Sequence, residues 1–186
     1  MYEMVEFVDD DYLKSLYSNG VHVVGNALSL RSKNYGELID SNLTIRFNWP
    51  ILDASTGYRM GAIFTSNTKK IPKNYAFDLL FTRHYKDPHN NKKQYTVEGA
   101  FITKLKTGYN LDKKPSNGLL CLYLLDVLGI ENVGIFGFDW KETPSTTKNN
   151  NFMKTATAKN DPWHNYYKEK EVALDMIKKN CWKLYK

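Results

Sequence analysis

The sequence predicts an α/β fold in which helices flank a mostly parallel sheet. Its 186 residues amount to one domain, so we expect residues 1–186 to fold as a single unit. Short apolar runs rich in β-branched and aromatic residues alternate with helical patterns, which is typical of parallel strands joined by crossover helices. A composition of 42% hydrophobic and 25% charged residues agrees with an ordinary globular protein. These features favour a Rossmann-like arrangement.

The first half of the chain begins with a helix and continues mainly as strands. Residues 10–17 are expected to form a short helix, for which the acidic residues 9–11 suit the start. Residues 21–24 are apolar and stop at Gly25, which predicts a buried strand followed by a turn. The other elements expected here are a helical stretch at 29–38 and strands at 43–48, 61–67 and 76–84.

The second half mixes strands and helices with one long polar segment. Residues 94–105 are β-rich and are expected to form a longer strand. An apolar helix at 115–128 and a buried strand at 131–138 follow. Residues 141–160 repeat Thr, Lys and Asn, which predicts a mobile loop or lid. Asp161 as N-cap with Pro162 after it predicts a helix from there to about Asn180.

The cysteines and the apolar runs of the sequence indicate the cellular compartment in which we expect the protein. No apolar run is long enough to cross a bilayer and the acidic N-terminus does not have the pattern of a secretory signal, so we expect no membrane span. Cys121 and Cys181 both lie in apolar helical patterns and are expected to be buried free thiols. Two cysteines without metal-ligand spacing predict no metal site and favour a cytoplasmic protein.

Positive charge is concentrated in the middle of the chain. Residues 51–114 hold twelve Lys and Arg against five Asp and Glu, a net charge of +7 within a total of +6. Lysine pairs at 69–70, 92–93 and 113–114 suit an anionic partner such as a nucleotide, a polyanionic glycan or nucleic acid. For any single pair, a solvated loop is the better explanation.

Four segments are expected at the carboxyl ends of the strands, where parallel sheets bind ligands. They are residues 25–27, 46–48, 115–118 and 137–139. Gly25 permits close backbone approach, and Asn26 offers amide donors. The Pro-Ser-Asn-Gly stretch before the apolar helix is a helix N-terminus, which can also receive an anion.

Three segments, read together, resemble the sialylmotifs of the animal-type sialyltransferases. Residues 23–50 resemble the large motif, with matches at Gly25, Asn26, Leu30, Ile39, Asp40, Arg46 and Asn48. Residues 114–138 resemble the small motif, with matches at Pro115, Ser116, Gly118, Leu119, Leu120, Gly137 and Phe138. Residues 164–171 resemble the very small motif, His-x4-Glu, at His164 and Glu169.

The resemblance implies a GT-A variant of the Rossmann-like fold and an inverting glycosyltransferase. Such an enzyme moves a sugar from a nucleotide-sugar donor, here a CMP-sugar, to an acceptor hydroxyl, usually on a glycan, without a metal or another cofactor. His164 would be its general base. The donor-binding residues implied are Gly25, Asn26, Asn48, Ser116, Asn117, Gly118, Gly137 and Phe138, with Arg46 and Glu169 in supporting roles.

The chain also departs from that family. The family's cysteine pair is absent, residues 141–160 show no match to its short aromatic motif, and its catalytic domain is considerably longer. The sequence therefore resembles a reduced, soluble relative, whose donor sugar and acceptor stay open.

Elementary physics agrees with a base at His164. We expect this residue in the first turn of the helix opened by Asp161, where the helix dipole disfavours the imidazolium ion. Glu169 lies five residues later, off the His164 face of such a helix, so we expect a structural role for it rather than direct pairing.

Two alternatives remain at this point. A phage-type DNA glycosyltransferase, acting on a hydroxymethylated base, would use the same chemistry with DNA as partner, and the basic middle segment favours it. A non-catalytic nucleotide- or nucleic-acid-binding module would keep the fold and have no catalytic base.

Overall fold

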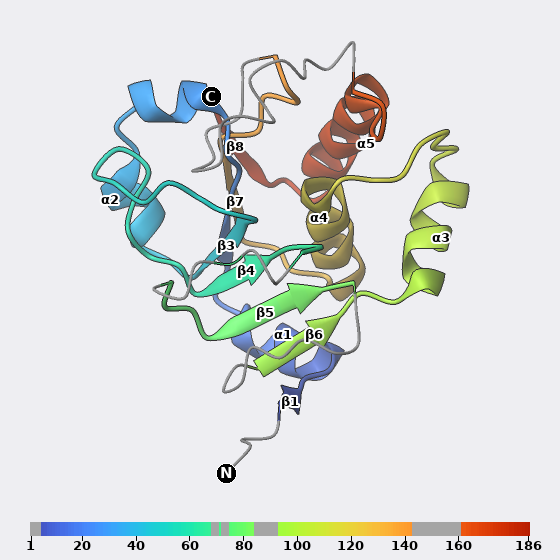
Figure 1. Cartoon of the computed structure of the whole chain (residues 1–186), viewed down its shortest axis with the longest axis horizontal. Coiled ribbons are helices and arrows are strands. Elements are labelled where there is room, and N and C mark those ends of the chain that lie inside the picture. Colours follow the sequence, from blue (N-terminus) through green and yellow to red (C-terminus); the bar gives the residue numbers. More distant parts are fainter. Residues whose placement is uncertain (1–4, 68–70, 72–74, 84–92, 143–160) are drawn as a thin grey trace.

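A single parallel sheet forms the centre of the computed structural model, which describes residues 5–67, 71, 75–83, 93–142 and 161–186. Its eight strands run parallel in the order β1-β6-β5-β4-β3-β2-β7-β8 (Figure 1). The strands are β1 Glu6–Phe7, β2 Val21–Val24, β3 Thr44–Phe47, β4 Ala62–Phe64, β5 Leu79–Thr82, β6 Lys93–Thr96, β7 Val133–Phe136 and β8 Lys183–Tyr185. All carboxyl ends therefore face the same edge, and the predicted fold class is confirmed.

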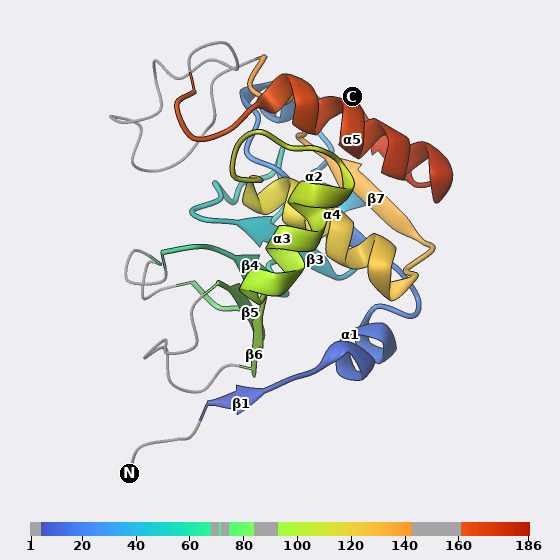
Figure 2. The same cartoon turned by 90° about the vertical axis from the view of Figure 1, so that its right-hand side faces the viewer.

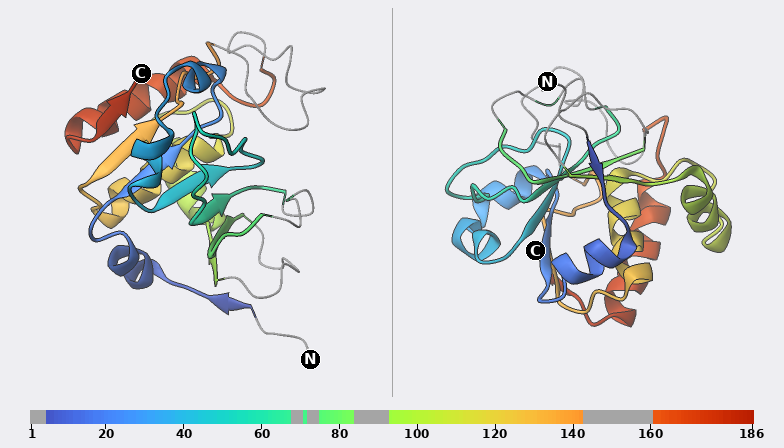
Figure 3. Two further views of the ribbon diagram at one scale, coloured as in Figure 1. Left: turned by 90° about the vertical axis from the view of Figure 1, so that its left-hand side faces the viewer. Right: turned by 90° about the horizontal axis from the view of Figure 1, so that it is seen from below.

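Helices cover both faces of this sheet (Figures 2 and 3). They are α1 Asp10–Leu16, the 3-10 helix η1 Leu28–Ser32, α2 Gly36–Asp40, α3 Gly99–Gly108, α4 Asn117–Leu128 and α5 Tyr166–Lys179. Helices α1, α3, α4 and α5 lie on one face, while η1 and α2 lie on the other. Side chains alternate accordingly, so that Phe64 joins the large core beneath α4 while Ile63 joins a smaller cluster on the opposite face.

The direction of the strand order changes beside β2. From β2 the chain adds β3, β4 and β5 outward on one side, and it later returns to place β7 on the other side of β2. The connection after β2 covers one face of the sheet, whereas α4, which leads into β7, covers the other. Open α/β sheets bind ligands at such a switch point, so the carboxyl ends of β2 and β7 mark the candidate site.

Most expected elements are present, and three expectations were wrong in part. The stretch 29–38 is divided between η1 and α2. Residues 94–105 contain β6 followed by α3, because Phe101, Ile102 and Leu105 pack as one face of a helix against the core. The helix expected from Asp161 begins only at Tyr166. The short edge strands β1 and β8 had not been expected.

Other expectations concern single residues. Asp9 caps α1 by accepting a hydrogen bond from the Tyr12 backbone N–H, 2.9 Å away, as the acidic start predicted. Cys121 is a buried free thiol, but Cys181 is exposed, because it lies in the turn between α5 and β8 with φ +54°. Among the described residues, no helix is both long and apolar enough to cross a membrane. The predicted lid falls almost wholly on 143–160, outside the described residues.

Candidate active site

Gly25 and Gly137 bring two strand ends into backbone contact at the switch point. A Cβ atom on Gly25 would lie 2.3 Å from the Gly137 carbonyl oxygen, so no larger residue fits without moving a strand. Gly137 has φ +64°, and its carbonyl accepts a hydrogen bond from the Ala27 N–H over 3.2 Å. Two of the predicted donor-binding glycines therefore form one corner.

Phe138 connects this corner to the start of α4. Its ring lies 3.0 Å from the position of a Cβ on Gly25 and equally close to that of a Cβ on Gly118. It also meets the Phe47 ring edge to face, with centroids 5.8 Å apart. The structure thus places Gly25, Gly118, Gly137 and Phe138 in one contact cluster.

Asn26 and Asn48 follow β2 and β3 beside this corner. The Asn26 amide donates to the Phe47 carbonyl over 2.9 Å and so links the two strand ends. Asn48 has φ +52°, and its side-chain oxygen accepts a hydrogen bond from the Thr65 hydroxyl over 3.2 Å. Thr65 was not predicted; only its position just after β4 could have indicated it. Both asparagines are partly buried, with polar groups at the carboxyl edge.

Ser116 and Glu169 connect the starts of α4 and α5. Ser116 caps α4, since its hydroxyl oxygen accepts from the Leu119 N–H. Its own N–H and hydroxyl donate to the two Glu169 carboxylate oxygens, at 2.9 and 2.5 Å. Asn117 and Gly118 are the first two residues of α4. The small-motif turn is therefore anchored by a carboxylate from the very small motif.

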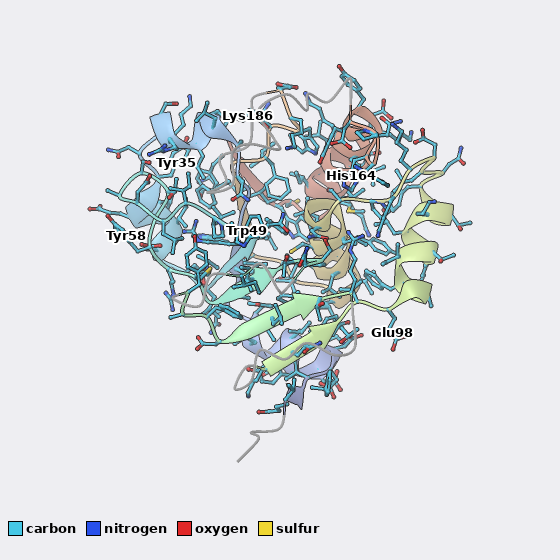
Figure 4. All side chains as sticks on the ribbon, viewed as in Figure 1. Tyr35, Trp49, Tyr58, Glu98, His164 and Lys186 are labelled. Carbon is cyan, nitrogen blue, oxygen red and sulfur yellow. The ribbon has the colours of Figure 1, made fainter. Side chains whose placement is uncertain are left out.

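His164 lies where the starts of α4 and α5 come together (Figure 4). The Asp161 carboxylate accepts the backbone N–H groups of Trp163 and His164, both over 2.9 Å, and so shapes the approach to the ring. The ring Nδ1 is 2.7 Å from the Lys114 carbonyl oxygen. A carbonyl only accepts hydrogen bonds, so the neutral ring carries its proton on Nδ1 and keeps the lone pair on Nε2.

Burial controls the charge of His164. Desolvation lowers the pKa of its ring below the ordinary value, and the positive charges of Arg83 and Lys114 act in the same direction. The Lys114 carbonyl and Asp161 oppose this lowering. The side chain is still 23% exposed, so it is not closed off from solvent. A neutral imidazole with an available lone pair can act as a general base.

Glu169 corrects one prediction. Its carboxylate Oε1 lies 3.6 Å from the His164 Nδ1, although the five-residue spacing on a helix had been expected to keep the two apart. The spacing rule does not apply, because His164 precedes Asn165, the N-cap of α5. Glu169 is 3% exposed, and burial raises the pKa of its carboxyl to about 7. The structural role expected for it agrees with its bonds to Ser116.

Arg46 does not reach this site. It pairs in register with Val24 and Ile63, both of which pack in clusters on the side opposite α4 and α5. Its guanidinium donates to the carbonyls of Arg59 and Thr56 at 2.7 and 2.8 Å. Arg46 is therefore a structural residue that fastens the loop between β3 and β4.

Arg83 is a residue of the site that the sequence did not indicate. It follows β5 directly, and its guanidinium Nη2 donates to the Pro115 carbonyl over 2.9 Å. A single arginine after a short strand carries no recognisable pattern, so only the fold could reveal it. Across the described ranges, His, Cys, Asp and Glu side chains form no group of three or more that could hold a metal ion.

Comparisons with known proteins were made on sequence and on structure. No family model matches the chain, and no curated protein sequence matches it. A mammalian sialyltransferase structure superposes with a TM-score of 0.58 at 19% identity over 89% of this chain and 68% of that one; it is described in complex with Gal-beta-1-3GalNAc-ortho-nitrophenol. The fold is that of a sialyltransferase.

A bacterial sialyltransferase has the same architecture. CstII from Campylobacter jejuni, described in complex with the substrate analogue CMP-3FNeuAc, superposes with a TM-score of 0.52 at 16% identity, covering 89% of this chain and 79% of that one. A variant of CstII in complex with CMP gives a TM-score of 0.54 at 16% identity over 88% and 80%. In this sialyltransferase fold, the three motif-like segments of the chain meet at the carboxyl edge of the sheet.

Proposed function

We propose that this protein is an inverting, metal-independent glycosyltransferase that transfers a sugar from a CMP-linked donor to an acceptor hydroxyl. One observation carries the proposal: the Lys114 carbonyl fixes the His164 tautomer with the lone pair on Nε2, beside the ligand edge of a sialyltransferase fold. The CMP ligands named for CstII support the choice of donor.

The transfer would proceed in one displacement. His164 Nε2 takes the proton of the acceptor hydroxyl while that oxygen bonds to the anomeric carbon of the sugar. The bond from this carbon to the phosphate oxygen breaks, and its electron pair leaves with CMP. A positioned base of this kind contributes roughly 10²–10⁴-fold to the rate.

The nucleotide would lie against the Gly25–Gly137 corner. Backbone can approach a ligand closely there, and Asn26, Asn48 and Phe138 adjoin it. Ser116 is already bonded to Glu169 through both donors, so the N–H groups of Asn117 and Gly118, at the start of α4, are better suited to meet the phosphate.

A ligand screen tests the donor. We expect CMP to raise the unfolding temperature and UDP, GDP and ADP to raise it less, because a ligand that binds only the folded state stabilises it by mass action. Stabilisation by another nucleotide but not by CMP would contradict the assignment.

The second arm tests the base. We expect His164→Ala to lower transfer roughly 10²–10⁴-fold while the CMP-induced shift persists. Tyr167→Phe, on the exposed side of α5, is the matched control. Unchanged transfer in His164→Ala would contradict the catalytic role, and CMP binding without transfer in the parent would favour the non-catalytic module.

The acceptor is best assigned to a glycan, as in the family that the motifs resemble. The DNA alternative depends on the lysine pairs, of which Lys69, Lys70 and Lys92 lie outside the described residues. It therefore stays a prediction, as does the cytoplasmic location. Fluorescence anisotropy with duplex DNA at low and high salt distinguishes the two acceptors, since phosphate contacts weaken steeply with salt.

A further inference from the structure

Three consecutive residues before α4 are each held by a charged or ionisable side chain from elsewhere in the chain. The Lys114 carbonyl accepts from His164 Nδ1, the Pro115 carbonyl from Arg83 Nη2, and the Ser116 N–H donates to Glu169. His164, the proposed base, and the Glu169 carboxylate are thus both hydrogen-bonded to the backbone of residues 114–116. Arg83, which directly follows β5, is the third side chain that is hydrogen-bonded to this backbone.

The surroundings of Arg83 are unusual for a guanidinium. Its Nε is buried and has no hydrogen-bond acceptor among the described residues. Burial lowers the pKa of Arg83 to about 10, and the charge of Glu169 opposes this. A partly buried cation whose Nε has no acceptor in the described part of the chain costs stability. An arginine at such a position is therefore better explained by its effect on neighbouring groups than by a contribution to stability.

We propose that Arg83 is a positioning residue for His164: it holds the backbone of residues 114–116 through the Pro115 carbonyl and sets, by its charge, the protonation of His164 and Glu169. This inference rests on the proposed function. No contact described joins Arg83 to the Gly25–Gly137 corner or to the His164 ring, and it acts through the backbone and the electric field.

The sign of the charge effect follows from the groups that surround the ring. Asp161 and the Lys114 carbonyl favour the protonated imidazole, while the charges of Arg83 and Lys114 disfavour it. Glu169 lies 3.6 Å from the ring Nδ1 and would favour the imidazolium only when it is itself ionised. The Arg83 charge also lowers the pKa of Glu169. Removal of the Arg83 charge should raise the pKa of both His164 and Glu169. The acidic limb of the pH profile of kcat/KM should therefore move to higher pH.

The experiment compares Arg83→Gln, Arg83→Lys and Lys178→Gln. Lys178 lies exposed in the last turn of α5 and gives the same charge loss at the far end of that helix from His164. NMR titration reads the His164 ring pKa without any donor, with the signal assigned by its loss in His164→Ala. Transfer kinetics across pH are measured in parallel, and thermal unfolding confirms that each variant folds.

We expect Arg83→Gln to raise the His164 pKa by about 0.5 unit and to lower kcat roughly tenfold or more. Arg83→Lys should keep that pKa close to the parent's and still lower kcat, because the lysine ammonium is a point charge on a flexible stem and holds the Pro115 carbonyl less rigidly than the planar guanidinium does. Lys178→Gln should change neither quantity.

Two results would overturn the inference. The first is a folded Arg83→Gln variant that has the parent's His164 pKa. The second is an Arg83→Lys variant that has the parent's kcat, and this result decides the matter even if Arg83→Gln does not fold. A parent chain that transfers no sugar would contradict the proposed function alone, because the NMR titration still shows whether Arg83 controls His164.

Discussion

At the scale of single residues, Glu169 is the carboxyl group whose charge is both opposed by burial and stabilised by its neighbours. It is a carboxyl group buried among the starts of two helices, where two Ser116 donors and Arg83 stabilise its charge against desolvation. Desolvation dominates, because the pKa of Glu169 is raised to about 7 from an ordinary 4.5. Its ionisation therefore opposes folding, although the ionised form is the one that Ser116 binds.

The pH dependence of stability tests this balance. Because the pKa of Glu169 is raised in the folded state, its carboxyl group contributes to the free energy of unfolding. This contribution is fully present below pH 4.5 and is lost as the pH rises to about 7. We expect the parent to lose up to about 3 kcal/mol relative to Glu169→Gln over that window. Urea unfolding at pH 4.5 and pH 8 measures the change.

Glu171→Gln is the control on the same helix, since Glu171 is exposed and paired only with Lys168 in the contacts described. It should show no comparable change between the two pH values. A stability difference between the parent and Glu169→Gln that stays constant with pH would refute the buried-charge account.

At the scale of elements, the ends of β2 and β7 form the switch point of the sheet. These strands are neighbours in the sheet although more than a hundred residues separate them, and two glycines let their ends touch. Close contact of this kind leaves a backbone-lined corner. Its shape depends on the absence of two Cβ atoms, and the Phe138 and Leu30 side chains pack against it.

Gly25→Ala tests the importance of that contact. The new Cβ would meet the Gly137 carbonyl at 2.3 Å, so one strand end must shift. We expect a loss of roughly 1–3 kcal/mol in the free energy of unfolding, together with a smaller CMP-induced shift. Denaturant unfolding and the ligand screen measure both quantities.

Gly99→Ala is the matched control, because a Cβ there would have no atom within 4 Å among the described residues, and alanine favours the α3 helix. This variant should be as stable as the parent or slightly more stable. Equal stability of Gly25→Ala and Gly99→Ala would show that the corner tolerates a side chain.

The sequence predicted elements well where pattern and packing agree. The apolar runs of β2, β3 and β7 and the apolar helix α4 were found because nearly every side chain in them is buried. Helix α3 was missed because its aromatic and β-branched residues favour a strand locally, and packing against α4 overrides that preference. Strand β1 is too short to produce a pattern.

The site was predicted in part for the same reasons. Gly25, Ser116 and His164 lie in segments that resemble known motifs, and the structure brings their surroundings together. Arg83, Thr65 and the proximity of Glu169 to His164 arise from strand order and from a helix start shifted to Tyr166. Contacts that depend on the tertiary fold in this way produce no periodic pattern in the sequence.

At the scale of the whole molecule, β8 closes one side of the sheet. The Tyr185 ring stacks on Phe136 with centroids 4.2 Å apart, and the Tyr35 hydroxyl donates to the Lys186 carbonyl over 3.0 Å (Figure 4). β8 also follows α5, so it ties the helix that bears Glu169 to the strand that precedes Gly137.

Tyr185→Ala tests this closure. We expect a loss of about 1–3 kcal/mol of stability, because the ring's stacking and buried area disappear. Tyr58→Ala, which removes a ring that is 64% exposed, should cost less than about 0.5 kcal/mol. Thermal unfolding of both variants measures the contrast, and equal losses would contradict a specific role for β8.

Strand order also has a consequence for synthesis. Residues leave the ribosome in sequence order, so the stretch that ends at Gly25 emerges long before Gly137 and His164. The Gly25–Gly137 corner and His164 cannot be brought together until most of the polypeptide has been translated. A truncated product that ends anywhere from Phe138 to Trp163 would therefore retain both corner glycines and lack the His164 imidazole.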